Sequence, residues 1–209
     1  MNLVRSAEFN GYPVLSKGGE LIEYILKGNE QIVYQSLHNH SRVVVMRFEL
    51  KFPVGYMGST EVISKFFDSL RYRINSDLAK KTEIRCRTIN SQIGYVWVKE
   101  LSTHHGWHYH VALLLNYDVY NSFGSINSTN ANMYNRILEA WASAIDYPVD
   151  GTRGLVHIPH NPIYKLERNS EYLIEGVHAV LQRLSYLAKL KTKPYQSGVR
   201  TRFYGTSKR

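Results

Sequence analysis

The sequence has few of the features that define several large classes of protein. It contains a single cysteine, Cys86, so no disulfide bond can form within the chain, as expected for a reducing cytosol. The first residues, MNLVRSAEFNGYP, lack the apolar core of a signal peptide, and apolar runs such as VALLL (111–115) are too short to cross a bilayer. No G-x-x-x-x-G-K-[ST] motif occurs. We therefore expect a cytoplasmic protein without a membrane span or a helicase motor of its own.

Acidic residues are absent from the last sixth of the chain. No Asp or Glu follows Glu175, and the whole chain has a net charge of +9. This imbalance favours a polyanionic partner such as nucleic acid, although a basic but otherwise ordinary enzyme would also fit. Among the 16 tyrosines and 3 tryptophans, some can stack on unpaired bases, while most will pack in the core. The residues expected to contact DNA near the C-terminus are Lys191, Lys193, Arg200, Arg202, Lys208 and Arg209.

Hydrophobic periodicity divides the chain into strands and helices. Strands are predicted over 42–52, 92–101, 108–115 and 154–159, and helices over 20–37, from Ser59 or Thr60 to about 78, 131–146 and 170–191. The first helix has a possible interruption at Gly28. This order predicts an α+β fold, with a ferredoxin-like antiparallel sheet and helices packed on one face. We expect a loosely held N-terminal arm at 1–19 that leads into the first helix, one domain at 20–193 and an irregular basic tail at 194–209.

The segment HGWHYHVALLL (105–115) begins with two histidines at the start of a predicted strand. Side chains two residues apart on a strand share a face, so His108 and His110 project together. Glu100 ends the preceding strand, and a hairpin places it roughly opposite this pair. Such a group, with open coordination positions, suits Mn²⁺ or Mg²⁺ that must also contact a phosphate oxygen. Other candidates for the third ligand are Glu49, His104 and His105.

Neither the histidine pair nor the Y-x-x-K motif described below is specific by itself. An H-x-H pair on a strand is more often structural than functional, and four histidines in seven residues could also bind zinc, although structural zinc sites usually include cysteines.

A second motif lies in SYLAKLKTK (185–193), where Tyr186 and Lys189 share a face of the predicted last helix. A tyrosine hydroxyl has a pKa of about 10, and a nearby ammonium group stabilises its phenolate and neutralises charge on a phosphate under attack. A structural tyrosine beside a solvated lysine is the more common reading of Y-x-x-K. Tyr172 and Tyr195 are alternative nucleophiles.

Together, the acid, the HYH strand and the downstream Y-x-x-K resemble the HUH endonuclease superfamily. The wider sequence resembles inovirus-type replication proteins and the YagK/YfjJ C-terminal domain family. The segments that carry this resemblance are RVVVMRFELKFP (42–53), YVWVKE (95–100), HYHVALLLN (108–116), GLVHIPHNPIYKL (154–166), SYLAKLKTK (185–193) and RFYGTSKR (202–209).

The resemblance implies a nickase that holds the 5′ end of a DNA strand as a phosphotyrosine and initiates rolling-circle replication of a phage, prophage or related element in a bacterial host. It implies that His108, His110 and Glu100 bind the metal, that Tyr186 is the nucleophile and that Lys189 contacts the phosphate. Single-stranded or origin DNA would be the substrate, and a host helicase and polymerase would be partners. A non-catalytic single-stranded nucleic-acid-binding module, a relaxase or transposase of the same superfamily, and a metal-dependent hydrolase that uses water stay open as alternatives.

Overall fold

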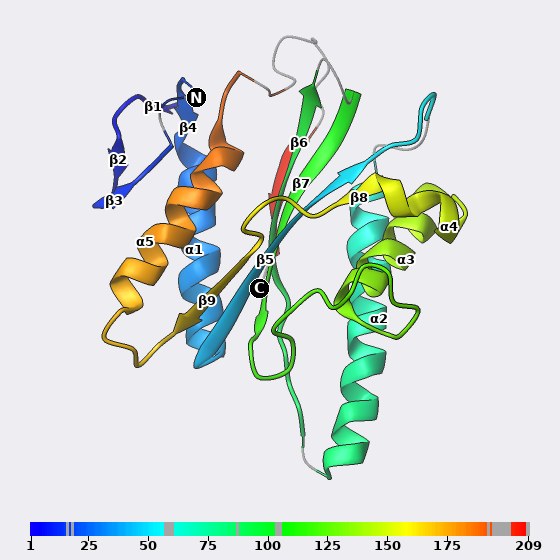
Figure 1. Cartoon of the computed structure of the whole chain (residues 1–209). Helices are drawn as coiled ribbons and strands as arrows, with labels where there is room; N and C mark the ends of the chain where they lie inside the picture. Colours follow the sequence, from blue (N-terminus) through cyan, green and yellow to red (C-terminus); the bar gives the residue numbers. More distant parts are fainter. Residues whose placement is uncertain are drawn as a thin grey trace.

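The computed structural model has a mixed α/β architecture built around one large sheet (Figure 1). The structure describes residues 1–15, 17, 19–56, 61–86, 88–102, 106–191, 193 and 202–207. The helices are α1 (Glu23–Asn39), α2 (Val62–Arg85), α3 (Met133–Ile145), α4 (Val149–Thr152) and α5 (Leu173–Ser185), with 3-10 turns η2 (Arg153–Leu155) and η3 (Tyr186–Ala188). The strands are β1 (Leu3–Val4), β2 (Glu8–Phe9), β3 (Tyr12–Pro13), β4 (Leu21–Ile22), β5 (Arg42–Lys51), β6 (Gly94–Ser102), β7 (Gly106–Asn116), β8 (Val156–His157), β9 (Ile163–Glu167) and β10 (Tyr204–Thr206).

The large sheet has the strand order β10-β6-β7-β5-β8, and β9 pairs with β5 as well. All strand pairings within the described residues are antiparallel. The predicted pairing of β6 with β7 is present, and its register sets Glu100 opposite His108. The strand β9 was not predicted, because IYKLE is short and directly follows Pro162.

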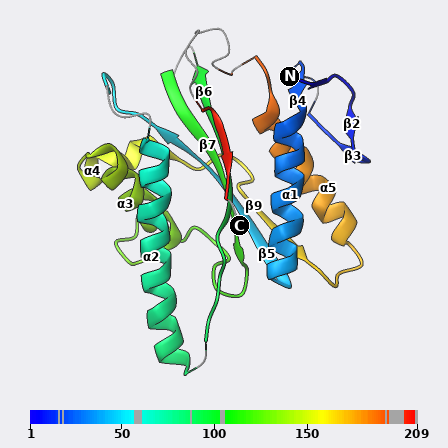
Figure 2. The ribbon, with the colours of Figure 1, turned by 180° about the vertical axis from the view of Figure 1, so that it is seen from behind.

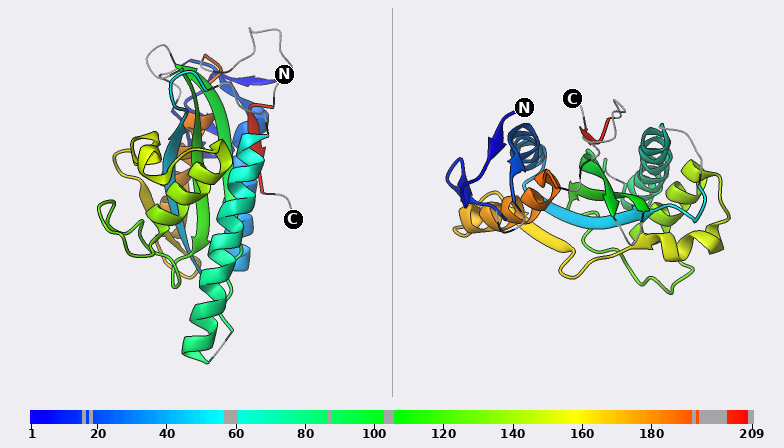
Figure 3. Two further views of the ribbon diagram at one scale, coloured as in Figure 1. Left: turned by 90° about the vertical axis from the view of Figure 1, so that its right-hand side faces the viewer. Right: turned by 90° about the horizontal axis from the view of Figure 1, so that it is seen from above.

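Helices cover both faces of the sheet, so the expectation of helices on one face is wrong (Figure 3). Even-numbered residues of β5, such as Val44 and Met46, pack in the core formed with α2 and α3. Val43 and Val45 pack on the opposite face, in a second core with α1 and α5. That second face of β5 becomes polar only toward the C-terminal end of the strand. The alternation of apolar and polar residues in the sequence, which predicted a strand with one buried face, therefore holds only for the C-terminal end of β5.

The N-terminal residues, expected to be loosely held, pack against the core of α1 and α5. The strand β1 pairs with β4, and Tyr12 and Val14 are buried. The backbone N–H of Leu15 donates a hydrogen bond to Ser185 Oγ at 2.8 Å. The first residues thus help to hold the C-terminal end of α5 in place.

Part of the predicted irregular tail forms the edge strand β10, which lies beside β6 (Figure 2). Tyr204 of this strand packs against α1 at Gly28, where an added Cβ would lie 1.9 Å from the tyrosine Oη. The glycine therefore allows a close approach and does not interrupt α1, which continues through it to Asn39.

The last long helix is shorter than the sequence predicts. It ends at Ser185, and Tyr186 begins the 3-10 turn. The following chain turns toward β4, where Lys189 forms a β-bridge with Leu21 and the Leu190 N–H donates to the carbonyl of Glu20. The helical periodicity continues through 191, but this pairing with a distant segment ends the helix. The predicted cap of the second helix, Ser59 or Thr60, lies outside the described residues.

None of the helices in the described ranges combines the length and the apolar character that a bilayer span requires.

Candidate functional site

Polar side chains gather where the α5 face of the sheet loses its apolar character. Residues directly opposite each other on neighbouring strands share a face, so the register defines short rows across β6, β7 and β5. The rows are Glu100–His108–Lys51, Val98–His110–Glu49 and Val96–Ala112–Arg47. The histidines and the acids therefore come from three adjacent, hydrogen-bonded strands, which fix their positions.

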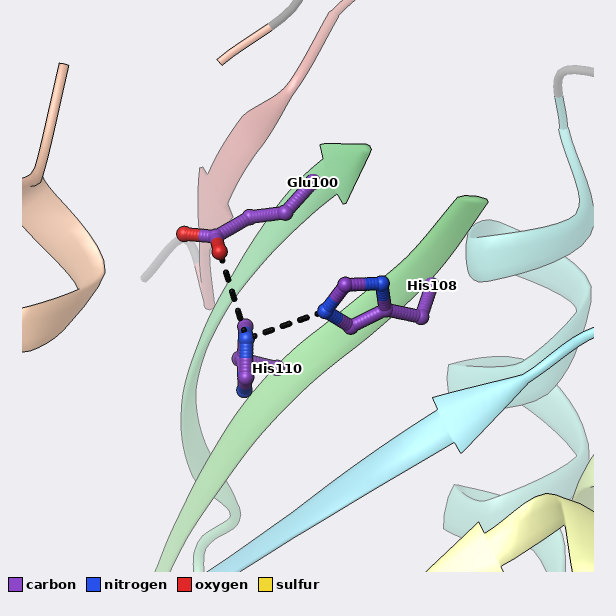
Figure 4. Close-up of side chains that lie close together, drawn as sticks. All are labelled: Glu100, His108 and His110. Atoms are coloured by element: carbon purple, nitrogen blue, oxygen red, sulfur yellow. Dashed lines mark hydrogen bonds and ion pairs between the residues drawn. The ribbon is translucent and has the colours of Figure 1, made fainter. Parts of the chain in front are cut away.

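Glu100, His108 and His110 form one buried group whose ligand atoms all lie within 4.8 Å of one another (Figure 4). The two histidine Nε2 atoms are 3.2 Å apart, and His110 Nε2 lies 3.3 Å from Glu100 Oε2. Ligands bound about 2.0–2.2 Å from one ion lie roughly 3 Å from each other. The three residues predicted from the sequence are thus brought together, and their donor atoms are spaced to hold a divalent cation.

The remaining ring nitrogen of each histidine faces an oxygen atom. His108 Nδ1 lies 3.1 Å from the carbonyl oxygen of Gly106. His110 Nδ1 forms an ion pair with Glu49 Oε1 at 3.2 Å, without the alignment of a hydrogen bond. Oxygen partners at Nδ1 favour the tautomer that leaves Nε2 for a metal. This arrangement is the one expected of a histidine metal ligand with a supporting acceptor.

Glu49, one of the alternatives for the third ligand, contacts His110 from the side opposite Glu100. Its other carboxylate oxygen lies 3.1 Å from Nδ1 of His157 on β8. Sequence analysis had not singled out His157. The other two alternatives, His104 and His105, lie outside the described residues.

Electrostatics keep the two acids ionised at neutral pH. Burial raises the pKa of Glu100, but hydrogen bonding to His110 and the Lys193 ammonium group outweigh it and bring the pKa to about 2. Burial likewise raises the pKa of Glu49, and its contacts with His110 and His157 outweigh that effect, again giving about 2. The two carboxylates, on β6 and β5, attract positive charge to this point of the sheet.

The pKa values of the two histidines are shifted in opposite directions. Burial lowers the pKa of His110, but Glu100 and Glu49 raise it by more. The pKa of His110 therefore lies above its usual value. Burial lowers the pKa of His108, and its contact with Gly106 only partly opposes this. Of the two histidines, His110 is therefore the one that binds a proton more readily.

Lys193 was expected to contact DNA, and the structure instead buries it in the site. Its ammonium group, with 0% of the side chain exposed, pairs with Oε1 of Glu100. Of the other predicted DNA contacts, Lys191 and Arg202 are exposed, and the Arg202 guanidinium lies 5.4 Å from the ring centre of Trp97. Arg200, Lys208 and Arg209 lie outside the described residues.

Tyr186 reaches the same site from η3, directly after α5. Its ring meets that of His110 edge to face, with centroids 5.4 Å apart. The Lys189 ammonium lies 3.8 Å from the centre of the Tyr186 ring, so the two residues are neighbours although they do not share an α-helix. Burial raises the pKa of Tyr186, as do Glu100 and Glu49, while Arg47 and Arg183 oppose them. Without a bound cation, Tyr186 is thus a neutral phenol.

Arg47 and Arg183 were also missed by sequence analysis. The period of two along β5 places Arg47 on the same face as Glu49, which was a usable signal. Arg183 precedes Tyr186 by three residues, but nothing in the sequence relates it to β5. The alternative nucleophile Tyr172 is exposed at the start of α5, and Tyr195 lies outside the described residues.

Comparison with known proteins places the chain in a family. Residues 4–207 match the profile of the YagK/YfjJ C-terminal domain, and the chain belongs to that family. It is 31% identical over 193 residues to the uncharacterized protein YagK of Escherichia coli K12, an alignment that covers 88% of this chain and 92% of the relative. It is 26% identical over 183 residues to the uncharacterized protein YfjJ of the same organism, covering 82% of this chain and 88% of YfjJ. No solved structure matches the chain significantly.

Proposed function

We propose that the protein is a metal-dependent endonuclease of the HUH type that nicks and rejoins single-stranded DNA through a covalent 5′-phosphotyrosine. Its role would be to initiate rolling-circle replication of a phage, prophage or related mobile element in the cytoplasm of a bacterial host. The observation that carries the proposal is the contact of Tyr186 with His110, within a group of three residues that can hold a metal. Two motifs that are weak when taken singly meet in one site.

The topology also supports a ferredoxin-like assignment for the central part of the chain. The order β8-β5-β7-β6, with α2 between β5 and β6 and α3 between β7 and β8, matches a β-α-β-β-α-β unit. Helices α2 and α3 both pack on the same face of this unit. In this interpretation, α1 and α5 are additions on the second face, and α5 carries the nucleophile to the metal ligands.

Glu100, His108 and His110 would hold Mn²⁺ or Mg²⁺, and one carboxylate with two imidazoles leaves further coordination positions open. When bound, the cation would polarise the scissile phosphate and neutralise charge that develops on it. Glu49 would fix the orientation of His110. Lys189 would add a positive charge near the phosphate.

In the proposed reaction, Oη of Tyr186 forms a bond to phosphorus and the bond from phosphorus to the 3′ oxygen breaks. The tyrosine loses its proton, and the leaving oxygen gains one and becomes a free 3′-OH. The 5′ side of the strand stays attached to Tyr186 as a phosphodiester. Attack by a 3′-OH on this link reverses the exchange and rejoins the strand. No ATP is needed because the bond energy is kept in the covalent link. A host polymerase would extend the 3′-OH, and a host helicase would unwind the duplex.

A denaturing gel tests the proposal. The protein is incubated with 5′- and 3′-labelled single-stranded oligonucleotides from its own genetic neighbourhood, with Mn²⁺ or with EDTA. We expect a metal-dependent product in which the 3′-terminal label migrates with the protein, absent in Tyr186→Phe and retained in Tyr172→Phe, the exposed tyrosine at the other end of α5. Cleavage without an adduct would indicate water as the nucleophile. DNA binding without cleavage would indicate a non-catalytic binding module.

A further inference from the structure

Arg47 is a buried cation that forms no ion pair with an acidic side chain of the described residues. It lies on β5 two residues before Glu49, and only 5% of it is exposed. Its Nη1 atom is buried and has no hydrogen-bond partner, and the residue takes part in no ion pair among the described residues. The residues outside the described ranges include no Asp or Glu, so no acidic side chain is left to pair with it. A buried charge without a partner is costly, which calls for a binding partner that the chain itself does not contain.

A second guanidinium group, that of Arg183, acts electrostatically on the first. Arg183 is in the last turn of α5, and its Nε atom is also buried without a hydrogen-bond partner among the described residues. Both arginines contact the short link between β8 and β9. The Arg183 Nη2 donates to the carbonyl of His160 at 3.4 Å, and the backbone N–H of Arg47 donates to that of Pro162 at 2.8 Å.

The positive charges of Arg47 and Arg183 repel each other when no anion is bound between them. Burial lowers the pKa of Arg47 to about 10, and the positive charge of Arg183 adds to that effect, while Tyr164, Glu49 and Tyr186 oppose it only in part. Both arginines also act on the Tyr186 hydroxyl, whose pKa they lower against burial and the two carboxylates. Two guanidinium groups with unused donors, next to one tyrosine hydroxyl, form a site for an anion.

We propose that Arg47 and Arg183 form a binding subsite for a backbone phosphate of the DNA strand, beside the Tyr186 hydroxyl. The inference rests on the proposed function, because it assigns a part of the same substrate. Neighbouring rows of residues across the sheet place side chains with two different roles along β5. The row with Glu49 supports the metal ligands, and the next row, with Arg47, faces the phosphate. The guanidinium groups would bind the non-bridging oxygens and hold the phosphate while it is attached to Tyr186.

The first test uses inorganic phosphate as the probe and thermal unfolding as the readout. Wild type, Arg47→Gln, Arg183→Gln and the control Arg42→Gln are heated in EDTA, with phosphate or with chloride at equal ionic strength. Arg42 lies on the same strand but is exposed and pairs with Asp118. We expect phosphate to raise the Tm of wild type and of the control, and the rise to be absent from both site variants. In chloride, Arg47→Gln should unfold at the wild-type temperature or above it, because an unpaired buried charge is removed.

A structural arginine would behave differently. If Arg47→Gln lowers the Tm in chloride and keeps the wild-type response to phosphate, or if phosphate gives wild type no rise over chloride, the subsite does not exist. The conservative variant Arg47→Lys keeps the charge without the planar fork and should regain only part of the response.

A second measurement separates this inference from the nickase proposal. In the adduct assay, Arg47→Gln should slow adduct formation roughly 100-fold, as does the loss of one donor to a developing oxyanion. Unchanged adduct formation together with an unchanged phosphate response would remove the subsite and leave the nickase intact. A phosphate response that depends on both arginines, in a protein that forms no adduct, would keep the subsite and remove the nickase.

Discussion

The ring of Tyr186 lies edge-on against the ring of His110, at an interplanar angle of 78°. His110 is fixed by its place in the centre of the sheet, and Tyr186 is fixed by α5, which packs on that sheet through residues such as Val180 and Leu184. The separation of the two functional groups is therefore set by the packing of a helix on a sheet. Such packing resists small displacements, which suits a reaction that depends on a precise approach of two groups.

Metal binding should depend on the three ligands and on the residue that orients them. In a calorimetric titration with Mn²⁺, we expect wild type to bind one ion per chain and His110→Ala to bind none. Glu49→Gln should weaken binding by roughly 10- to 100-fold, as is typical when the partner of a ligating histidine is lost. His178→Gln, on α5 outside the cluster, is the control. Wild-type affinity in His110→Ala would show that the group is not the metal site.

The free energy of unfolding should show the contribution of the buried ion pair between Lys193 and Glu100. Glu100→Gln leaves the enclosed Lys193 ammonium without its carboxylate, and we expect the free energy of unfolding to fall by about 3–5 kcal/mol. Adding Lys193→Met removes that unpaired charge, so the double variant should recover most of the loss. Urea denaturation at neutral pH measures both effects. A double variant no more stable than Glu100→Gln alone would show that the two side chains are not coupled.

The pH dependence of stability should include a contribution from Asp77, which lies on α2 and is not part of the group formed by Glu100, His108 and His110. Asp77 on α2 accepts hydrogen bonds from Arg136 of α3 at 2.5 Å and from the Tyr120 hydroxyl at 2.8 Å, and it pairs with Lys81. Burial raises its pKa, but these contacts outweigh burial and lower the pKa. The stabilisation is thus fully present above the unfolded pKa of about 3.9 and is lost as the pH falls through the lower, folded value.

For this reason, Asp77→Asn should be less stable than wild type at pH 7 by about 1–3 kcal/mol, and the difference should shrink once the pH falls below about 4. The control is Asp68→Asn, on the exposed side of the same helix, where the acid pairs with Arg71. It should unfold like wild type throughout. A gap between Asp77→Asn and wild type that stays constant down to acidic pH would contradict the linkage.

The grouping of Glu100, His108 and His110 could be predicted because it follows from strand geometry alone. The period of two puts His108 and His110 on one face, and the antiparallel pairing of neighbouring strands puts Glu100 beside them. The residues around them could not be found in this way. Lys193 reaches Glu100 after the chain has passed through α5, and Arg183 approaches β5 from the end of that helix. These contacts depend on how α5 sits on the sheet, which no local pattern encodes.

The faces of the sheet were misread for a related reason. Val43 and Val45 are apolar, whereas Arg47, Glu49 and Lys51 on the same face are polar, and the polar end was taken to represent the whole strand. The end of α5 was placed too late because YLAKL continues the helical pattern. Pairing with the segment around Glu20 and Leu21 ends the helix there, and only the tertiary structure shows it.

The most direct test of the central claim identifies the attached residue itself. The protein is incubated with the cleaved oligonucleotide and Mn²⁺, the DNA is trimmed by nuclease, and the protein is digested and analysed by tandem mass spectrometry. The account predicts a nucleotide joined through phosphate to Tyr186 and to no other tyrosine. A nucleotide on another residue, or cleaved DNA with an unmodified Tyr186 peptide, would contradict it.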